Sequence, residues 1–133
     1  MIAKFKAKRI DNGEWVYGYY FLTPLTDEST PESMPEDGWF FLVGKKRHCI
    51  SKNSCVYEVD EKTVCHFTQS LDTENNEIYD GDKIQNENGI VAVVYWHEEY
   101  LAWYVKREDY DYVTMPLYKF KGKVIGNINE DLK

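Results

Sequence analysis

Short runs of alternating or continuous apolar residues, separated by tight turns, predict a chain built from β-strands. Residues 4–10 and 14–22 flank Asp11-Asn12-Gly13, and Asn-Gly between β-prone runs is the strongest short-range signal for a hairpin. The second run is apolar on both faces, and Gly18 in its middle indicates a bulge or a close approach of another strand. The chain is therefore expected to begin with a β-hairpin.

The segment that follows this hairpin, residues 23–38, carries Pro24, Pro31 and Pro35 among acidic and hydroxyl residues. Prolines at this density exclude a regular helix or a central strand, so the segment is expected to be a long loop. The next predicted strands cover residues 39–43 and 56–59, with a turn at 44–47 and a short strand continuation at 48–50.

The second half of the chain has a more regular pattern. Residues 83–86 and the apolar run 90–97 flank Glu87-Asn88-Gly89, which predicts a second hairpin. The run 90–96 is apolar throughout, as in a strand buried on both faces or lying at a subunit contact. With further strands expected at 101–106, 115–120 and 123–128, residues 63–133 are predicted to form a small SH3-like β-barrel. Residues 1–62 are predicted to form an N-terminal β lobe, and we expect the two to make one compact structural unit.

Aromatic residues strengthen the prediction of a mainly β fold and supply the first functional candidates. The chain has 11 Tyr, 6 Phe and 4 Trp, and aromatics suit a pleated, half-buried surface. Tyr and Trp are also enriched at interface hot spots, so a homo-oligomer contact or a partner-binding face is one interpretation; filling of a barrel core and its rim is the other. The residues that we single out as possible interface positions are Trp96, Tyr100, Tyr104, Tyr110 and Tyr112. Three further exposed candidates are Tyr19, Tyr20 and Tyr118.

The net charge of -7 is unevenly distributed. Residues 1–52 carry 8 basic against 7 acidic side chains, whereas residues 53–133 carry 8 against 16. A nucleic-acid binder needs lysine and arginine to neutralise phosphates, so the acidic half argues against that class. The alternative function that remains is nucleic-acid binding through the basic clusters of the N-terminal half, with Lys45, Lys46 and Arg47 as possible phosphate contacts; lysines that protect an edge strand are the simpler interpretation.

Candidate metal and catalytic sites fail on spacing. An EF-hand loop counted from Asp72 would need glycine at its sixth position and glutamate at its twelfth, but the residues there are Glu77 and Lys83. Cys65 and His66 are neighbours in a predicted strand, so their side chains point to opposite faces and cannot act as nucleophile and base. The possible soft-metal ligands lack the close pairs of a zinc site; they are His48, Cys49, Cys55, Cys65, His66 and His97. We therefore predict no catalytic, cofactor-binding or metal-binding residues and no enzymatic activity.

Cellular location follows from the cysteines and the N-terminus. Three cysteines without C-x-x-C spacing favour reduced, buried thiols over a disulfide framework. The N-terminal residues lack an apolar signal-peptide core, and no run is long enough to span a bilayer. A cytoplasmic protein is expected.

The segment 59–84, VDEKTVCHFTQSLDTENNEIYDGDKI, resembles the signature segment of the YopX family of phage and prophage proteins. The matching positions are Thr63-Val64, Phe67-Thr68, Asp72, Glu77-Ile78-Tyr79 and Asp80-Gly81-Asp82, supported by Glu14 to Tyr19 and Lys123 to Ile128. Cys65 stands where the family commonly has glycine, and Gln69-Ser70 replaces the usual glycine after the threonine. The resemblance implies a prophage context, a β-rich fold and homo-oligomerisation, and it implies no established biochemical activity.

Overall fold

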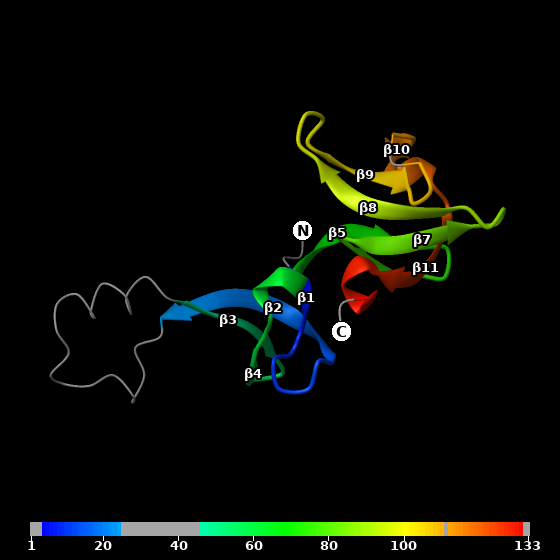
Figure 1. The fold of residues 1–133 in the computed structure, drawn as a ribbon. Coiled ribbons are helices and arrows are strands. Elements are labelled where there is room, and N and C mark those ends of the chain that lie inside the picture. Colours follow the sequence, from blue (N-terminus) through cyan, green and yellow to red (C-terminus); the bar gives the residue numbers. More distant parts are fainter. Residues whose placement is uncertain (1–3, 25–45, 111, 132–133) are drawn as a thin grey trace, which may run out of the picture. The chain divides into compact units, whose positions relative to one another are not determined.

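The computed structural model describes residues 4–24, 46–110 and 112–131, and these form two compact units (Figure 1). One unit comprises Lys4–Val64, and the other the described residues from Cys65 onward. The predicted strand at 39–43, Lys45 and nearly all of the predicted 23–38 loop lie outside the described residues. No helix in the described part has the length and apolar character that crossing a bilayer requires.

The N-terminal unit is an antiparallel sheet with the strand order β4-β3-β2-β1. Its elements are β1 (Phe5–Lys8), β2 (Trp15–Pro24), β3 (Lys46–Lys52), β4 (Cys55–Glu58) and the 3-10 helix η1 (Glu61–Thr63). The predicted first hairpin is confirmed by the pairing of β1 with β2. Gly13 has a φ of +72° in the turn, a conformation that glycine adopts without steric cost. The turn predicted at 44–47 is wrong at its end, because Lys46 and Arg47 already pair with β2.

Gly18 marks a close approach between β2 and β3. A Cβ atom at this position would overlap the carbonyl oxygen of Ser51, so the predicted close crossing of another strand is confirmed. The strands beside it bury a small apolar cluster of Ala7, Val16, Ile50 and Val59. The absence of a side chain at position 18 therefore lets β3 pack directly against this core.

The C-terminal unit combines a hairpin with an open antiparallel sheet of strand order β10-β9-β8-β7-β11. Its strands are β5 (Cys65–Leu71), β6 (Glu77–Tyr79), β7 (Asp82–Asn86), β8 (Val91–His97), β9 (Ala102–Arg107), β10 (Thr114–Pro116) and β11 (Gly122–Asn127). The 3-10 helices η2 (Leu117–Lys119) and η3 (Ile128–Asp131) follow β10 and β11. The core consists of Ile78, Ile84, Ala92, Val94, Val105 and Leu117. The second Asn-Gly hairpin is confirmed by the pairing of β7 with β8.

The mainly β prediction is confirmed, but the SH3-like barrel is not. Within the described residues neither sheet closes, because β10 and β11 are the two ends of the C-terminal sheet and do not pair with each other. The strand predicted at 115–120 is also wrong: β10 ends at Pro116, and Leu117–Lys119 form η2 instead. Proline has no N–H to continue a ladder, which leaves this edge too short for closure.

The acidic residues between β5 and β7 hold the backbone together. Asp72 is buried, and its carboxylate accepts hydrogen bonds from the backbone N–H groups of Glu74 and Asn76 at 2.8 Å and of Val124 at 2.9 Å. Burial by itself would raise the pKa of Asp72, but these N–H donors outweigh it and hold the pKa below its ordinary value. The segment that invites a metal-site interpretation is therefore a set of hydrogen-bonded turns.

Asp82 and Gly81 fix the start of β7. The Asp82 carboxylate is fully buried and accepts from the Tyr79 N–H at 2.7 Å and from the Asn127 amide at 2.8 Å. Gly81 has a φ of +81°, as expected for a turn that starts a strand. Gln69 also has a positive φ, of 70°, at the place where the family that the sequence resembles usually has glycine. Gln69 lies within β5, where the register against β6 shifts, so its positive φ accompanies an irregularity of the strand.

Candidate functional site: an aromatic face on the C-terminal sheet

Four ring side chains cluster on the face of β8 and β9 that points away from the core. Tyr95 and His97 alternate along β8 with the buried Val94, so the period of two places them on the opposite face of the strand. Tyr104 is the direct partner of Tyr95 in β9. We call Tyr95, His97, Tyr100 and Tyr104 the aromatic face.

The rings of the aromatic face contact one another, with Tyr100 stacked on both His97 and Tyr104 and the other pairs tilted. The His97 ring centroid lies 4.5 Å from that of Tyr100 and 4.8 Å from that of Tyr104, and the Tyr100 and Tyr104 centroids are 5.6 Å apart. The backbone N–H of Tyr100 donates to Nδ1 of His97 at 3.3 Å, which fixes the turn between β8 and β9. Such contacts make the cluster a preorganised surface rather than a set of independent side chains.

Solvent exposure and charge define what this face can do. The side chain of Tyr100 is 61% exposed, whereas Tyr104 is half-buried. Burial among its neighbours raises the pKa of Tyr104, with smaller contributions from the surrounding tyrosines, so the phenol stays neutral at physiological pH and is a poor general base. The Tyr104 phenol is therefore suited to hydrogen bonding rather than to taking up a proton.

Opposite charges lie at the two ends of the aromatic face. Glu98 and Glu99 are exposed in the turn after β8. At the other end Lys106 and Lys83 both pair with Val93 across the sheet. The Lys106 ammonium lies 5.5 Å from the Tyr95 ring centroid, and the Lys83 ammonium is 3.8 Å from a carboxylate oxygen of Glu108. The face is acidic at its turn and basic along the strands.

The structure divides the predicted interface residues among three places. Tyr100 and Tyr104 belong to the aromatic face. Trp96 lies on the other side of the sheet, in an edge-to-face contact of 5.2 Å with Trp103, and Tyr110 and Tyr112 contact each other in the loop after β9 at 5.6 Å. Tyr95 and His97 were missed because residues 90–96 resemble a uniformly apolar strand; their i, i+2 spacing was the available signal.

Of the three predicted phosphate contacts, Lys45 lies outside the described residues, and the other two do not share a face of the sheet. Lys46 and Arg47 are adjacent in β3, so their side chains point to opposite sides of the sheet. The Nε atom of Arg47 lies 3.7 Å from a carboxylate oxygen of Glu58. Farther along the N-terminal unit, the Lys6 and Lys8 ammonium groups lie over the Trp15 ring at 4.7 and 5.5 Å.

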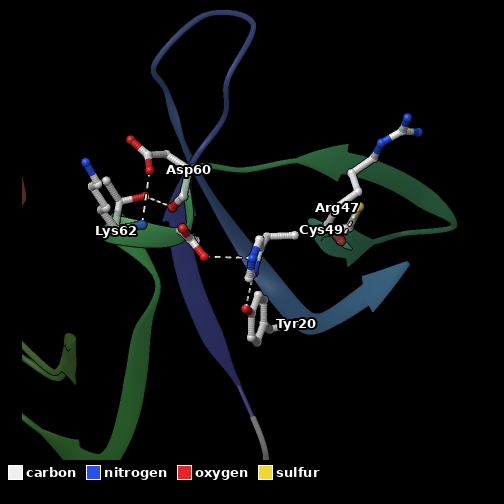
Figure 2. Close-up of polar contacts among 8 residues, drawn as sticks. Tyr20, Arg47, Cys49, Asp60 and Lys62 are labelled. Atoms are coloured by element: carbon white, nitrogen blue, oxygen red, sulfur yellow. Dashed lines mark hydrogen bonds and ion pairs between the residues drawn. The ribbon is translucent and has the colours of Figure 1, made fainter. Parts of the chain in front are cut away.

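A second polar cluster, not expected from the sequence, connects three elements of the N-terminal unit. The Tyr20 hydroxyl is 2.5 Å from Nδ1 of His48, and Nε2 of His48 is 2.8 Å from a carboxylate oxygen of Glu61. The imidazole thus contacts both the phenol and this carboxylate, and dashed lines in Figure 2 mark such contacts beside the labelled Tyr20. Burial raises the pKa of Tyr20, and the charge of Glu61 adds to the effect, so the phenol stays protonated at physiological pH. The chain of contacts ties β2, β3 and η1 together.

The cysteines are free thiols, and the structure separates them. Cys49 and Cys65 are buried, and Cys55 is exposed. The Cys65 sulfur accepts from the side-chain amides of Asn127 and Asn129 at 3.8 and 3.6 Å. Among the described residues, no group of three or more His, Cys, Asp or Glu side chains could hold a metal ion.

Comparison with known proteins gives one match. The model of a family described as YopX protein matches residues 4–132, nearly the whole chain. No curated protein and no solved structure matches the chain.

Proposed function

Because the chain belongs to the YopX family, we propose that it is a non-enzymatic phage accessory protein of the cytoplasm, a β-rich module that forms a homo-oligomer through the aromatic face. The observation that carries the proposal is the ordered ring cluster of Tyr95, His97, Tyr100 and Tyr104, in which Tyr100 is exposed and the other three rings are half-buried. Tyrosine offers a large, rigid contact area with a polar tip, which is why it dominates interface hot spots.

A second copy of this chain is the occupant that the charge pattern favours. In a two-fold contact the same patch packs on itself in the opposite direction. The acidic turn at Glu98 and Glu99 of one copy would then face Lys106 of the other, with Tyr95 and Tyr104 near the axis. Charge complementarity of this kind fixes the register of two faces and raises the rate of association.

The test is the mass of the protein in solution. We expect a dimer by light scattering after size exclusion at about 100 μM, a concentration at which a micromolar contact is saturated. The double variant Tyr100→Ser and Tyr104→Ser is expected to be a monomer with an unchanged far-UV spectrum. Tyr110→Ser with Tyr112→Ser removes the same number of rings outside the face and should leave the dimer intact. A monomeric wild-type protein, or equal effects of the two double variants, would refute the proposal.

The second candidate, nucleic-acid binding, is supported by lysines that lie over aromatic rings. Lys106 lies over the Tyr95 ring, and proteins that bind single strands combine stacking rings with cations. The exposed Glu98 and Glu99 in the turn after β8 oppose it, as does the acidic charge of the C-terminal half. A gel shift of a single-stranded oligonucleotide that weakens steeply with salt would support this candidate, and no shift at low salt would eliminate it.

A further inference from the structure

A cleft of about 290 Å³ opens in the C-terminal unit, apart from the aromatic face. Its inner wall is apolar and includes the buried Ala92 and Val105 and the half-buried Phe120. Val113 and Met115, both partly exposed, line the cleft nearer to solvent. The apolar core of the sheet is therefore accessible at this point.

Cationic side chains surround the cleft. Arg107, Lys119 and Lys121 line it, and no acidic side chain does so among the described residues. Arg107 is engaged by Asp109, to which its Nε and Nη2 donate at 2.9 and 2.7 Å. Lys119 and Lys121 are exposed at the cleft. Two lysines at an apolar opening, in the half of the chain with twice as many acidic as basic residues, are complementary to a ligand with carboxylates beside an apolar group.

The size and position of the cleft indicate the class of ligand. A volume of 290 Å³ lies at the lower limit of sites for small molecules and is enough for one bulky side chain as an anchor. Thr114 and Met115, which line the cleft, belong to β10, the end strand of the sheet. An outer strand is a template for an extended peptide, whose side chains then enter adjacent pockets.

We propose that this cleft binds an extended segment of a partner protein, in which one bulky apolar residue is flanked by glutamate or aspartate. The apolar residue fills the cleft beside Ala92 and Phe120, and the carboxylates contact Lys119 and Lys121. This site is distinct from the aromatic face and gives the module a binding function in addition to self-association.

The experiment measures fluorescence anisotropy of short labelled peptides with one central leucine or tryptophan among glutamate and serine. We expect binding that weakens as salt is added, and loss of binding when the central residue is replaced by serine or the glutamates by lysine. Lys119→Glu with Lys121→Glu is expected to weaken binding about tenfold. Lys52→Glu with Lys62→Glu makes the same change of charge at exposed positions of the N-terminal unit and should change the affinity little. Met115→Asp provides an independent test of the apolar wall.

Three results would overturn the proposal. One is no binding by any peptide of this set at about 1 mM. Another is equal weakening by the two lysine variants, which would assign the effect to net charge. The third is tighter, lysine-dependent binding of a single-stranded oligonucleotide, which would replace the peptide with a different class of partner. Both lysine variants should keep the solution mass of the wild type, so failure here is separable from failure of the proposed dimer.

Discussion

Replacing Asp82 by alanine tests whether the signature segment acts through buried hydrogen bonds. The carboxylate is fully buried and accepts from the Tyr79 N–H and the Asn127 amide. The variant removes both acceptors and leaves the donors in the protein interior. Each buried donor that loses its acceptor costs about 1–3 kcal/mol. Asn127 keeps longer contacts with the Asp80 carbonyl oxygen at 3.2 Å and the Cys65 sulfur at 3.8 Å, so its share should fall at the low end.

The expected total is a loss of about 3 kcal/mol in the free energy of unfolding, a large part of the roughly 5–15 kcal/mol typical of a domain. With a urea m-value of about 1.5 kcal/mol per molar, the midpoint should fall by about 2 M. The assay is urea unfolding followed by tryptophan fluorescence, with hydrogen exchange of β7 as the local measurement. Trp96 and Trp103 report on the unit that contains Asp82.

Two further variants make this prediction decisive. Asp60→Ala removes an exposed carboxylate that accepts from the Lys62 N–H at 3.0 Å, and such a cap contributes only about 1 kcal/mol. Asp82→Asn keeps one acceptor oxygen and should fall between the other two. If Asp82→Ala unfolds within about 0.5 kcal/mol of wild type, the two hydrogen bonds do not carry the stability of this turn, and the argument from buried donors fails.

Two other substitutions follow from the packing and the charges. In a thermal melt, Gly18→Ala should destabilise the N-terminal unit by about 1–3 kcal/mol, because the new Cβ displaces the Ser51 carbonyl. The control is Gly13→Asn, which lies in open space at a φ that asparagine tolerates and should be nearly neutral in the same measurement. Asp80→Asn should stabilise the protein at neutral pH, because burial raises the pKa of Asp80 and so penalises its ionised form. The charge of Asp82 also raises this pKa, whereas His66 lowers it. The penalty on the wild type is absent below the unfolded pKa of about 4 and grows as pH rises through the folded pKa, so the advantage of the variant should vanish in acid. An advantage that stays constant with pH would show that ionisation of Asp80 is not its cause.

Local signals in the sequence predict local structure well. The two Asn-Gly turns and Gly18 each owe their effect to one or two residues, and all three predictions are confirmed. Barrel closure depends instead on pairing between the ends of a sheet, and Pro116 ends β10 before such pairing can extend. The contacts from Tyr20 to His48 and from His48 to Glu61 join three separate elements. No spacing in the sequence encodes them. The positive φ of Gln69 was not predicted, because glutamine carries no local signal for a left-handed conformation.

The candidate site was partly accessible for the same reason. Tyr100 and Tyr104 were selected for their aromatic character, but the face on which a strand residue lies depends on strand register. Trp96 was therefore grouped with Tyr100 and Tyr104, although it lies on the other side of the sheet. Tyr95 and His97 became visible only once β8 was known to bury Ala92 and Val94 on one side. The cleft beside β10 could be found only from the course of the chain through Pro116 and η2. The sequence predicted a strand at 115–120 instead, so it gave no sign of the cleft.

Family membership and function rest on different residues of this chain. Asp72, Tyr79 and Asp82 carry the family resemblance, and each is buried and engaged in hydrogen bonds that define turns. The surfaces that we assign to binding are formed by residues outside that segment, on β8, β9 and η2. Substitutions on these surfaces alter no buried hydrogen bond of the signature, so they can change without loss of the fold. We therefore expect relatives to share this fold and its turns, and to differ in the aromatic face and the cleft, the two surfaces that we propose for binding.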